Sequence, residues 1–328
     1  MLDYAPLIQL AQENETFVLT SHTRADCDAV GSELGLLLAL QAMGKTARIV
    51  NADAPPPHIA FIDPDHRVEV LGEGVTVADV HAADVHLVLD TSAWGQLGDM
   101  AEVIRDSPAK KLVLDHHASG DDLGAVMLKD TAAEATGRLV LDAIEALGVP
   151  LTAAMATPLF AAIATDTGWF RFSSVTEETY RAAAKLVAAG VNPGELFALL
   201  FERNSAARVR LHGRVMEGVQ LAMGGRVAYS AVDKPDFAAT GAILTDTEDV
   251  VNRLLSIAGV EVAALLAWMD DGVTKVSLRS RGDFVVRDVT EEFGGGGHAK
   301  AAGVRIKKPV DEALAMVLAS IERRMNAE

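Results

Sequence analysis

The sequence predicts an α/β protein in which a doubly wound, mostly parallel sheet is joined by a helix to a smaller C-terminal α/β domain. In the first half, short apolar runs typical of strands alternate with longer patterns typical of helices, as parallel sheets require. Strand-like runs resume after Gly224-Gly225, which indicates a second group of elements. The chain has 328 residues, 50% of them apolar, so it is long enough to bury two cores.

Two apolar runs of the first half end in aspartate. The segments HLVLD and KLVLD are apolar without alternation, which is typical of parallel strands that helices cover on both faces. Their last residues, Asp90 and Asp115, therefore lie at the carboxyl ends of strands, where open α/β sheets bind their ligands. The expected elements are strands over 17–20, 47–50, 85–90 and 111–115 and a helix over 32–43.

Helical patterns rich in alanine fill 132–190, and a further helix is expected over 205–223, where the Gly224-Gly225 pair ends it. After this helix, strands are expected over 227–232, 260–269 and 273–280. We place the domain boundary in the helix. The expected parts are an N-terminal domain 1–204, a linker helix 205–225 and a C-terminal domain 226–328.

Charge and cysteine content exclude several classes of partner. The 29 basic and 46 acidic residues give a formal charge of −17, so the broad basic surface that grips duplex DNA is not expected. A single cysteine, Cys27, excludes an intrachain disulfide. The N-terminal segment lacks the pattern of a signal peptide, and no apolar run reaches the length of a membrane span. We therefore expect a soluble, cytoplasmic protein that does not span a membrane.

Four separated segments offer side chains that bind divalent metal ions. Each follows a predicted strand or helix, so a doubly wound sheet would bring them to one edge. Four carboxylates at such close range would repel one another, whereas two divalent cations would cancel their charge. Oxygen and imidazole ligands favour Mn²⁺, with Mg²⁺ as the alternative. The six expected metal ligands are His22, Asp26, Asp28, Asp90, His116 and Asp166.

Two such ions about 3.5 to 4 Å apart would convert a bridging water into hydroxide that attacks phosphorus in line. The ligand set therefore predicts phosphoester hydrolysis.

A second signal is the glycine run Gly294 to Gly297, which His298 follows and the strand-end segment Arg279-Ser280-Arg281 precedes. Glycines before a short helical run would let backbone N–H groups approach an anion, which the histidine and an arginine would also bind. Neither a dinucleotide-binding fingerprint nor a P-loop occurs, which disfavours nucleoside triphosphate chemistry. The residues of this run that are expected to bind substrate are Gly295, Gly296, Gly297 and His298.

Together these motifs resemble the DHH phosphoesterase family with its DHH-associated C-terminal domain, over nearly the whole chain. The residues that carry the resemblance are His22-x3-Asp26-x-Asp28-x2-Gly31-Ser32, Asp90, Asp115-His116-His117, Asp166-Thr167-Gly168 and the terminal GGGGH-x3-AG. The length, the segment RNSAARVRLHGRVM and the ending GGGGHAKAAG are most similar to the bacterial nanoRNase and pAp phosphatase branch.

The resemblance implies a homodimeric, Mn²⁺-dependent enzyme with its active site in the cleft between the two domains. It implies degradation of short RNA oligonucleotides to mononucleotides and removal of the 3′-phosphate of 3′-phosphoadenosine 5′-phosphate. It also implies that Asp90, Asp115, His116 and His117 act at the reaction centre, where Asp90 bridges two ions, His117 contacts the scissile phosphate and Asp115 orients the histidines. From the smaller domain, it implies that Arg279, Ser280 and His298 bind the phosphates of the substrate. The implied ligands are His22, Asp26 and Asp90 for one ion, and Asp28, Asp90, His116 and Asp166 for the other.

The chain departs from the family pattern at three places. Arg24-Ala25 stands where the family usually has Asn-Pro, and Cys27 stands where it has Gly, so a cation and a thiol lie beside the expected metal ligands. Arg287 lies in a segment where the branch tends to have Asn and Ala. We expect Cys27 to be a buried space-filling residue rather than a ligand.

Two alternative functions stay open. One is a phosphodiesterase that acts on linear or cyclic dinucleotides such as pApA, pGpG or cyclic di-AMP. The other is a nucleotide sensor without catalytic activity. A RecJ-type exonuclease is disfavoured by the acidic charge, and a family II pyrophosphatase by the GGGGH ending.

Overall fold

The computed structural model describes residues 2–269 and 272–326, with the side chain of His298 excepted. The chain divides into two compact units, Met1–Arg203 and Asn204–Glu328. Each unit has its own sheet and its own buried core, and the two are described separately below.

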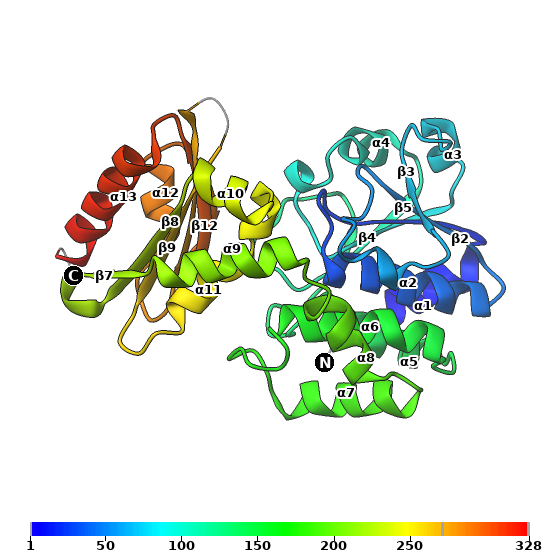
Figure 1. The fold of residues 1–328 in the computed structure, drawn as a ribbon. Coiled ribbons are helices and arrows are strands. Elements are labelled where there is room, and N and C mark those ends of the chain that lie inside the picture. The colour runs from blue at the N-terminus through cyan, green and yellow to red at the C-terminus, as the bar shows by residue number, and fades with distance from the viewer. Residues whose placement is uncertain (1, 270–271, 327–328) are drawn as a thin grey trace. The chain divides into compact units, whose positions relative to one another are not determined.

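The sheet of the first unit is parallel throughout, in the order β3-β2-β1-β4-β5-β6 (Figure 1). This is the strand order of dinucleotide-binding folds, and the direction of winding reverses between β1 and β4. The predicted fold class is therefore confirmed for this unit. The strands are β1 (Thr16–Thr20), β2 (Thr46–Asn51), β3 (Val68–Val70), β4 (Val85–Leu89), β5 (Lys110–Asp115) and β6 (Val126–Lys129).

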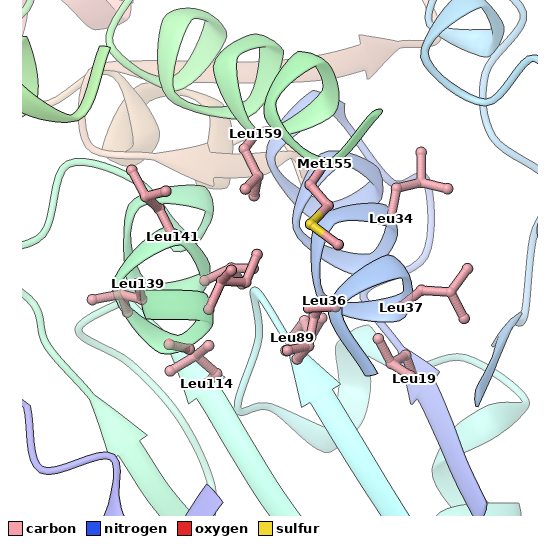
Figure 2. Close-up of a cluster of buried hydrophobic side chains, with 14 of the residues drawn as sticks. Leu19, Leu34, Leu36, Leu37, Leu89, Leu114, Leu139, Leu141, Met155 and Leu159 are labelled. Atoms are coloured by element: carbon pink, nitrogen blue, oxygen red, sulfur yellow. The ribbon is translucent and has the colours of Figure 1, made fainter. Parts of the chain in front are cut away.

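Helices cover both faces of this sheet because both faces of each central strand are apolar. In β1, Phe17 and Leu19 face one core while Val18 faces the other. Figure 2 shows the larger core, where leucines of β1, β4 and β5 meet side chains of α2, α5 and α6. The helices are α1 (Ala5–Glu13), α2 (Cys27–Ala42), α3 (Val77–His81), α4 (Met100–Asp106), α5 (Thr136–Ala146), α6 (Ala153–Asp166), α7 (Glu177–Ala188) and α8 (Pro193–Phe201).

Helix α2 begins earlier than the sequence pattern predicts and packs unusually closely on α6. Asp26 is its N-cap and accepts hydrogen bonds from the backbone N–H groups of Asp28 and Ala29. A Cβ atom at Gly31 would lie 2.3 Å from the carbonyl oxygen of Pro158 on α6. The glycine therefore permits this close approach, which holds Asp28 and Asp166 on neighbouring helices.

The second unit contains a mixed sheet in the order β11-β12-β10-β9-β8-β7, in which only β8 and β9 run parallel among the paired strands described. Side chains of α9 and α11 pack on one face, and those of α12 and α13 pack on the other. A smaller C-terminal α/β domain was predicted and is confirmed. Its elements are α9 (Ala206–Glu217), β7 (Gln220–Ala222), β8 (Val227–Val232), α10 (Lys234–Thr240), α11 (Val250–Leu255), β9 (Val262–Trp268), β10 (Thr274–Ser280), α12 (Val286–Glu291), β11 (Gly296–His298), β12 (Ala301–Ile306) and α13 (Val310–Met325).

Two predictions for this unit are wrong. The helix expected to continue to 223 ends at Glu217, because Gln220–Ala222 pairs with β8 instead. Leu211 and Val215 of this helix are buried in a core of the second unit, and the division into 1–204, a linker helix 205–225 and 226–328 stays a prediction. The helical run expected after the glycines is strand β12, since pairing with β10 outweighs the helix propensity of its alanines.

Among the described residues, no single helix is long and apolar enough to cross a membrane. Helices α7 and α8 meet the length and composition requirements only as a pair bent by 103°.

Candidate metal centre and anion cavity

The first cluster of expected ligands lies where β1 and β4 end, at the point where the winding of the sheet reverses. His22 and Asp26 follow β1, and Asp90 follows β4. The Nε2 atom of His22 lies 3.4 Å from Oδ2 of Asp90. One ligand atom from each of the three residues lies within 4.8 Å of the others. This arrangement suits a cation that would sit among two carboxylates and one imidazole.

The second cluster adjoins the first through Asp90. Nε2 of His116 lies 3.7 Å from Oδ2 of Asp28, 3.5 Å from Oδ2 of Asp166 and 3.6 Å from Oδ1 of Asp90. Ligand atoms of Asp28, His116 and Asp166 also lie within 4.8 Å of one another. The structure therefore brings together all six side chains that the sequence singled out, in two groups with Asp90 between them.

Hydrogen bonds from the outer ring nitrogens prepare both histidines to bind metal. Nδ1 of His22 donates to the carbonyl oxygen of Thr23 at 3.0 Å, and Nδ1 of His116 donates to that of Ala133 at 3.2 Å. Because a carbonyl oxygen only accepts, each Nδ1 carries the hydrogen. The Nε2 lone pairs are left to face the carboxylates, as in histidines that bind cations.

Backbone groups at the start of α5 hold the deepest carboxylate. The N–H groups of Thr136 and Gly137 each donate to Asp28 at 2.7 Å, and the Thr136 hydroxyl donates to Asp90 at 2.8 Å. A Cβ atom at Gly137 would lie 2.6 Å from that of Ala162. The sequence analysis missed both residues, because a threonine-glycine pair at a helix start carries no metal-binding signal of its own.

The electrostatics of the cluster favour bound cations. Asp28 and Asp90 are 1% and 2% exposed. Burial raises the pKa of Asp28 well above its usual value, and the charges of Asp90 and Asp166 raise it further. Burial and the charge of Asp26 likewise raise the pKa of Asp90. Divalent cations would offset this repulsion, so the residues fit the metal ions that the sequence predicts.

We expect Mn²⁺ to stabilise the folded protein measurably. At a hundredfold excess over Kd, binding contributes about 2.7 kcal/mol, which corresponds to a Tm increase of about 5–10 °C for a unit of this size. A carboxyl group whose pKa is raised by folding stabilises the folded protein at pH values below its pKa in the unfolded chain. This contribution to stability is lost as the pH rises through the raised pKa of the folded state. The cation removes that loss, so differential scanning fluorimetry should show a larger Tm increase at about pH 8 than at about pH 6. An equal Tm with EDTA and with Mn²⁺ would contradict the assignment.

Asp115 and His117 form a hydrogen-bonded pair beside the second cluster. Nδ1 of His117 donates to Oδ1 of Asp115 at 2.9 Å and lies 3.7 Å from Asp90. Burial alone would raise the pKa of Asp115, but hydrogen bonds from His117 and Ser92 hold it well below its usual range. The bond to Asp115 in turn raises the pKa of His117. His117 is therefore suited to present a cationic N–H group to a phosphate.

Behind His22, a buried polar chain fixes the end of β1. Nδ2 of Asn51 donates to Glu33 at 3.0 Å, and Oδ1 of Asn51 accepts from the Ser21 N–H at 3.0 Å and from the Thr20 hydroxyl at 3.1 Å. Glu33 is fully buried, and burial raises its pKa from 4.5 to about 7. This network places the backbone immediately before the first expected ligand.

The raised pKa of Glu33 makes stability depend on pH. Between its unfolded pKa and about 7, the unfolded chain has lost the proton that the folded chain retains, so the stability falls as the pH rises. Across this window the wild type should lose about 3 kcal/mol more than Glu33→Gln does. Urea unfolding of both proteins at several pH values checks this. If the unfolding free energies of the two proteins change with pH in the same way, Glu33 ionises normally.

The residues at which the chain departs from the family pattern lie in different environments. Arg24 is exposed in the loop between His22 and Asp26, with a positive φ of 55°. Cys27 is 3% exposed in the core, as a space-filling residue is expected to be, and burial raises its pKa to about 12. Arg287 is exposed and lies 3.6 Å from Glu291.

The second unit contains a cavity of about 470 Å³ that is lined by residues of β10, β11 and β12 and of the segment 247–251. Of the predicted substrate-binding residues, Arg279, Gly296 and Gly297 line it. Burial lowers the pKa of Arg279, and no ion pair joins its side chain to a carboxylate among the described residues. A half-buried cation that forms no ion pair within the described part of the chain is suited to bind an anionic ligand.

Gly296 lies in the glycine run, at a position where the fold does not require a glycine. Its φ is not in the left-handed region, and a Cβ atom there would meet no atom within 4 Å. We therefore expect Gly296→Ala to leave the Tm unchanged and to raise KM about tenfold by blocking the approach of a phosphate. Gly295 differs, because its Cβ would lie 2.5 Å from the carbonyl oxygen of Gly303. Gly295→Ala should therefore lower stability by about 2 kcal/mol, and a Tm loss in Gly296→Ala of the same size would contradict this distinction.

Three predicted substrate-binding residues are not placed in the cavity. Ser280 is on the opposite face of β10 from Arg279, is 7% exposed and donates its hydroxyl to the carbonyl oxygen of Phe284, so the structure does not bring it to the cavity. Gly295 packs against β12 and is not among the residues that line the cavity. The side chain of His298 lies outside the described part of the chain, so its role stays a prediction.

A parallel sheet with histidines and aspartates gathered at its switch point, in a chain with a second mixed-sheet unit, defines the class of two-domain, metal-dependent phosphoesterases. The chain belongs to the DHH family. The family model described as "DHH family, N-terminal domain" matches residues 16–163, and that of the DHHA1 domain matches residues 224–327. The resemblance inferred from the motifs is therefore confirmed.

Curated relatives and a solved structure agree with this assignment. The chain is 33% identical over 320 residues to the bifunctional oligoribonuclease and PAP phosphatase NrnA of Thermus thermophilus, covering 96% of this chain and 91% of the relative. It is 27% identical over 303 residues to NrnA of Bacillus subtilis, covering 92% of each. A crystal structure of an exopolyphosphatase-related protein from Bacteroides fragilis has the same fold, with a TM-score of 0.92 at 24% identity over 98% of this chain and 97% of the other.

Proposed function

We propose that this protein is a Mn²⁺-dependent phosphoesterase that degrades short RNA oligonucleotides to mononucleotides and removes the 3′-phosphate of 3′-phosphoadenosine 5′-phosphate. The observation that carries the proposal is the gathering of six separate His and Asp side chains into two adjoining groups. The chain is 33% identical to an oligoribonuclease and PAP phosphatase over nearly the whole length of both proteins, which supports the substrate assignment.

The residues of the first unit have distinct roles in this proposal. His22 and Asp26 hold one cation, Asp28, His116 and Asp166 hold the other, and Asp90 contacts both. When bound, the cations activate water and stabilise the negative charge that develops on the phosphate. His117, which Asp115 orients, donates a hydrogen bond to the scissile phosphate. In the second unit, Arg279 and the backbone N–H groups near Gly296 bind a phosphate group.

The remaining expectations belong to this proposal as predictions. They are the choice of Mn²⁺ over Mg²⁺, two ions per chain, a homodimer, a cytoplasmic location and no binding of duplex DNA. The −17 charge of the chain agrees with the last of these, because a strongly acidic protein binds long nucleic acids poorly.

The experiment uses the metal-stripped protein with Mn²⁺ added back. Phosphate released from 3′-phosphoadenosine 5′-phosphate is compared with mononucleotides released from pApA, a labelled RNA 5-mer, a long single strand and cyclic di-AMP. We expect turnover of the first three and much slower turnover of the long strand. Turnover of cyclic di-AMP alone would establish the dinucleotide alternative, and binding without any turnover would establish a nucleotide sensor.

A further inference from the structure

The ammonium group of Lys129 joins the ends of three neighbouring strands beside the metal ligands. Lys129 is the last residue of β6 and pairs with Asp115, the last residue of β5. Its Nζ atom lies 3.2 Å from Oδ2 of Asp115 and donates at 2.7 Å to Oγ of Ser92, in the segment that follows β4. It also donates at 2.8 Å to the carbonyl oxygen of Ser119, in the loop that follows His117. An ammonium group has three N–H donors, so each of them has a partner.

The carboxylate of Asp115 is held at both of its oxygens. Oδ1 accepts from the backbone N–H of His117 at 3.0 Å and from Nδ1 of its ring at 2.9 Å. Oδ2 accepts from the Ser92 hydroxyl at 2.7 Å and faces Lys129. A carboxylate offers about four acceptor positions, and each of them is filled here. The fully buried carboxylate therefore cannot rotate away from His117 without losing its bonds to Ser92 and Lys129.

The loop that follows His117 is built around this ammonium group. A Cβ atom at Gly120 would lie 2.2 Å from Oγ of Ser92 and 3.0 Å from Nζ of Lys129, so a glycine is required where the loop passes. The backbone N–H of Asp121 then donates to the carbonyl oxygen of Ser92 at 2.7 Å. Lys129 thus bonds to the chain on both sides of His117.

The His117 ring has a second carboxylate within reach. Its Nδ1 atom lies 3.7 Å from Oδ1 of Asp90, so a rotation of the ring would move this donor from Asp115 toward an expected metal ligand. A buried ion pair often stabilises a protein no more than apolar side chains of the same volume would, whereas its hydrogen bonds hold the groups that it joins in one arrangement. The arrangement that Lys129 holds is the one in which Asp115 is the partner of His117.

We propose that Lys129 is a positioning residue, which holds the Asp115 carboxylate and thereby keeps the His117 ring directed at the scissile phosphate. The inference rests on the proposed function and adds a residue that binds neither metal nor substrate. An orientation that matters in the transition state affects kcat more than KM. Loss of Lys129 should therefore slow turnover and leave substrate binding nearly unchanged.

Nuclear magnetic resonance of the full chain, labelled with ¹⁵N at histidine, tests the orientation without turnover. The protein is kept in Mg²⁺, because paramagnetic Mn²⁺ would broaden the signals, and the His117 ring signal is assigned from its absence in His117→Gln. In the wild type the Nδ1–H group of His117 should exchange slowly with water, because Asp115 accepts its hydrogen. In Lys129→Met this hydrogen should exchange at least about tenfold faster.

Steady-state kinetics on the RNA 5-mer with Mn²⁺ test the consequence for turnover. Lys129→Met should lower kcat about tenfold and leave KM within about twofold of the wild type. Because Lys129 acts through His117, the double variant His117→Ala/Lys129→Met should be no slower than His117→Ala.

Lys111→Met is the matched control for both measurements. Nζ of Lys111 also bonds to a backbone carbonyl oxygen, that of Ser107 at 2.8 Å, but at the opposite end of β5 from Asp115. This variant should leave the exchange rate of the His117 hydrogen and kcat unchanged.

An unchanged exchange rate in Lys129→Met, or a further loss of kcat in the double variant, would overturn the proposal. So would a Lys111→Met protein that shows the same faster exchange. If Lys129→Met does not fold, Lys129→Gln replaces it in both measurements. Wild-type protein whose His117 hydrogen is protected in the Lys129-dependent way, but which hydrolyses nothing with Mn²⁺, would refute the proposed function and leave the positioning of the ring standing.

Discussion

Replacing Asp90 with asparagine is expected to lower kcat/KM at least about a thousandfold, which corresponds to about 4 kcal/mol of transition-state stabilisation. Asp90 lies between the two groups of expected ligands, 3.4 Å from His22 and 3.6 Å from His116. Asparagine keeps the size of the side chain but removes its negative charge, so neither cation would be held in place. Steady-state kinetics on the RNA 5-mer, with Mn²⁺ in excess, measure the effect.

Asp99→Asn is the matched control, because Asp99 is an exposed aspartate of the same unit that makes no capping hydrogen bond. It should retain wild-type activity and the Mn²⁺-dependent increase in Tm. The Asp90→Asn protein should fold but lose most of that increase. Normal activity of Asp90→Asn would refute the metal assignment.

Replacing Asp115 with asparagine should destabilise the protein by about 3 kcal/mol, because it leaves the Lys129 ammonium without its negative partner. Asp115 is fully buried, and Nζ of Lys129 lies 3.2 Å from its Oδ2 atom. The substitution also weakens the hydrogen bond that orients His117, so kcat should fall as well. Urea unfolding and steady-state kinetics measure the two losses.

A double-mutant cycle separates the ion pair from the general cost of each change. Lys129→Met should also destabilise the protein, because it leaves the Asp115 carboxylate without its cation. The double variant Asp115→Asn/Lys129→Met should be more stable than the sum of the two single losses predicts. Additive losses would mean that Asp115 and Lys129 do not interact.

The expected metal ligands could be predicted from the sequence because the parallel sheet places them. Parallel strands end at one edge, so residues that follow β1, β4 and β5 meet there however far apart they are in the chain. Asp28 and Asp166 come from two helices that Gly31 lets pack closely. Aspartates and histidines at the ends of predicted strands and helices were therefore sufficient to predict the metal ligands.

The supporting residues could not be predicted in the same way. Thr136 and Gly137 act through backbone N–H groups, which every residue type has, so their role depends on where α5 starts. Lys129 lies on β6, a strand that the sequence analysis did not identify. Strand periodicity already separates Ser280 from Arg279, since neighbours in a strand face opposite sides and Arg279 lines the cavity.

The most direct measurement is anomalous X-ray diffraction at the manganese edge from crystals of the full chain grown with Mn²⁺. The proposed centre requires two peaks about 3.5 to 4 Å apart. One peak should lie among His22, Asp26 and Asp90, and the other among Asp28, Asp90, His116 and Asp166. A single peak, or manganese bound elsewhere with these side chains bare, would contradict the two-cation phosphoesterase.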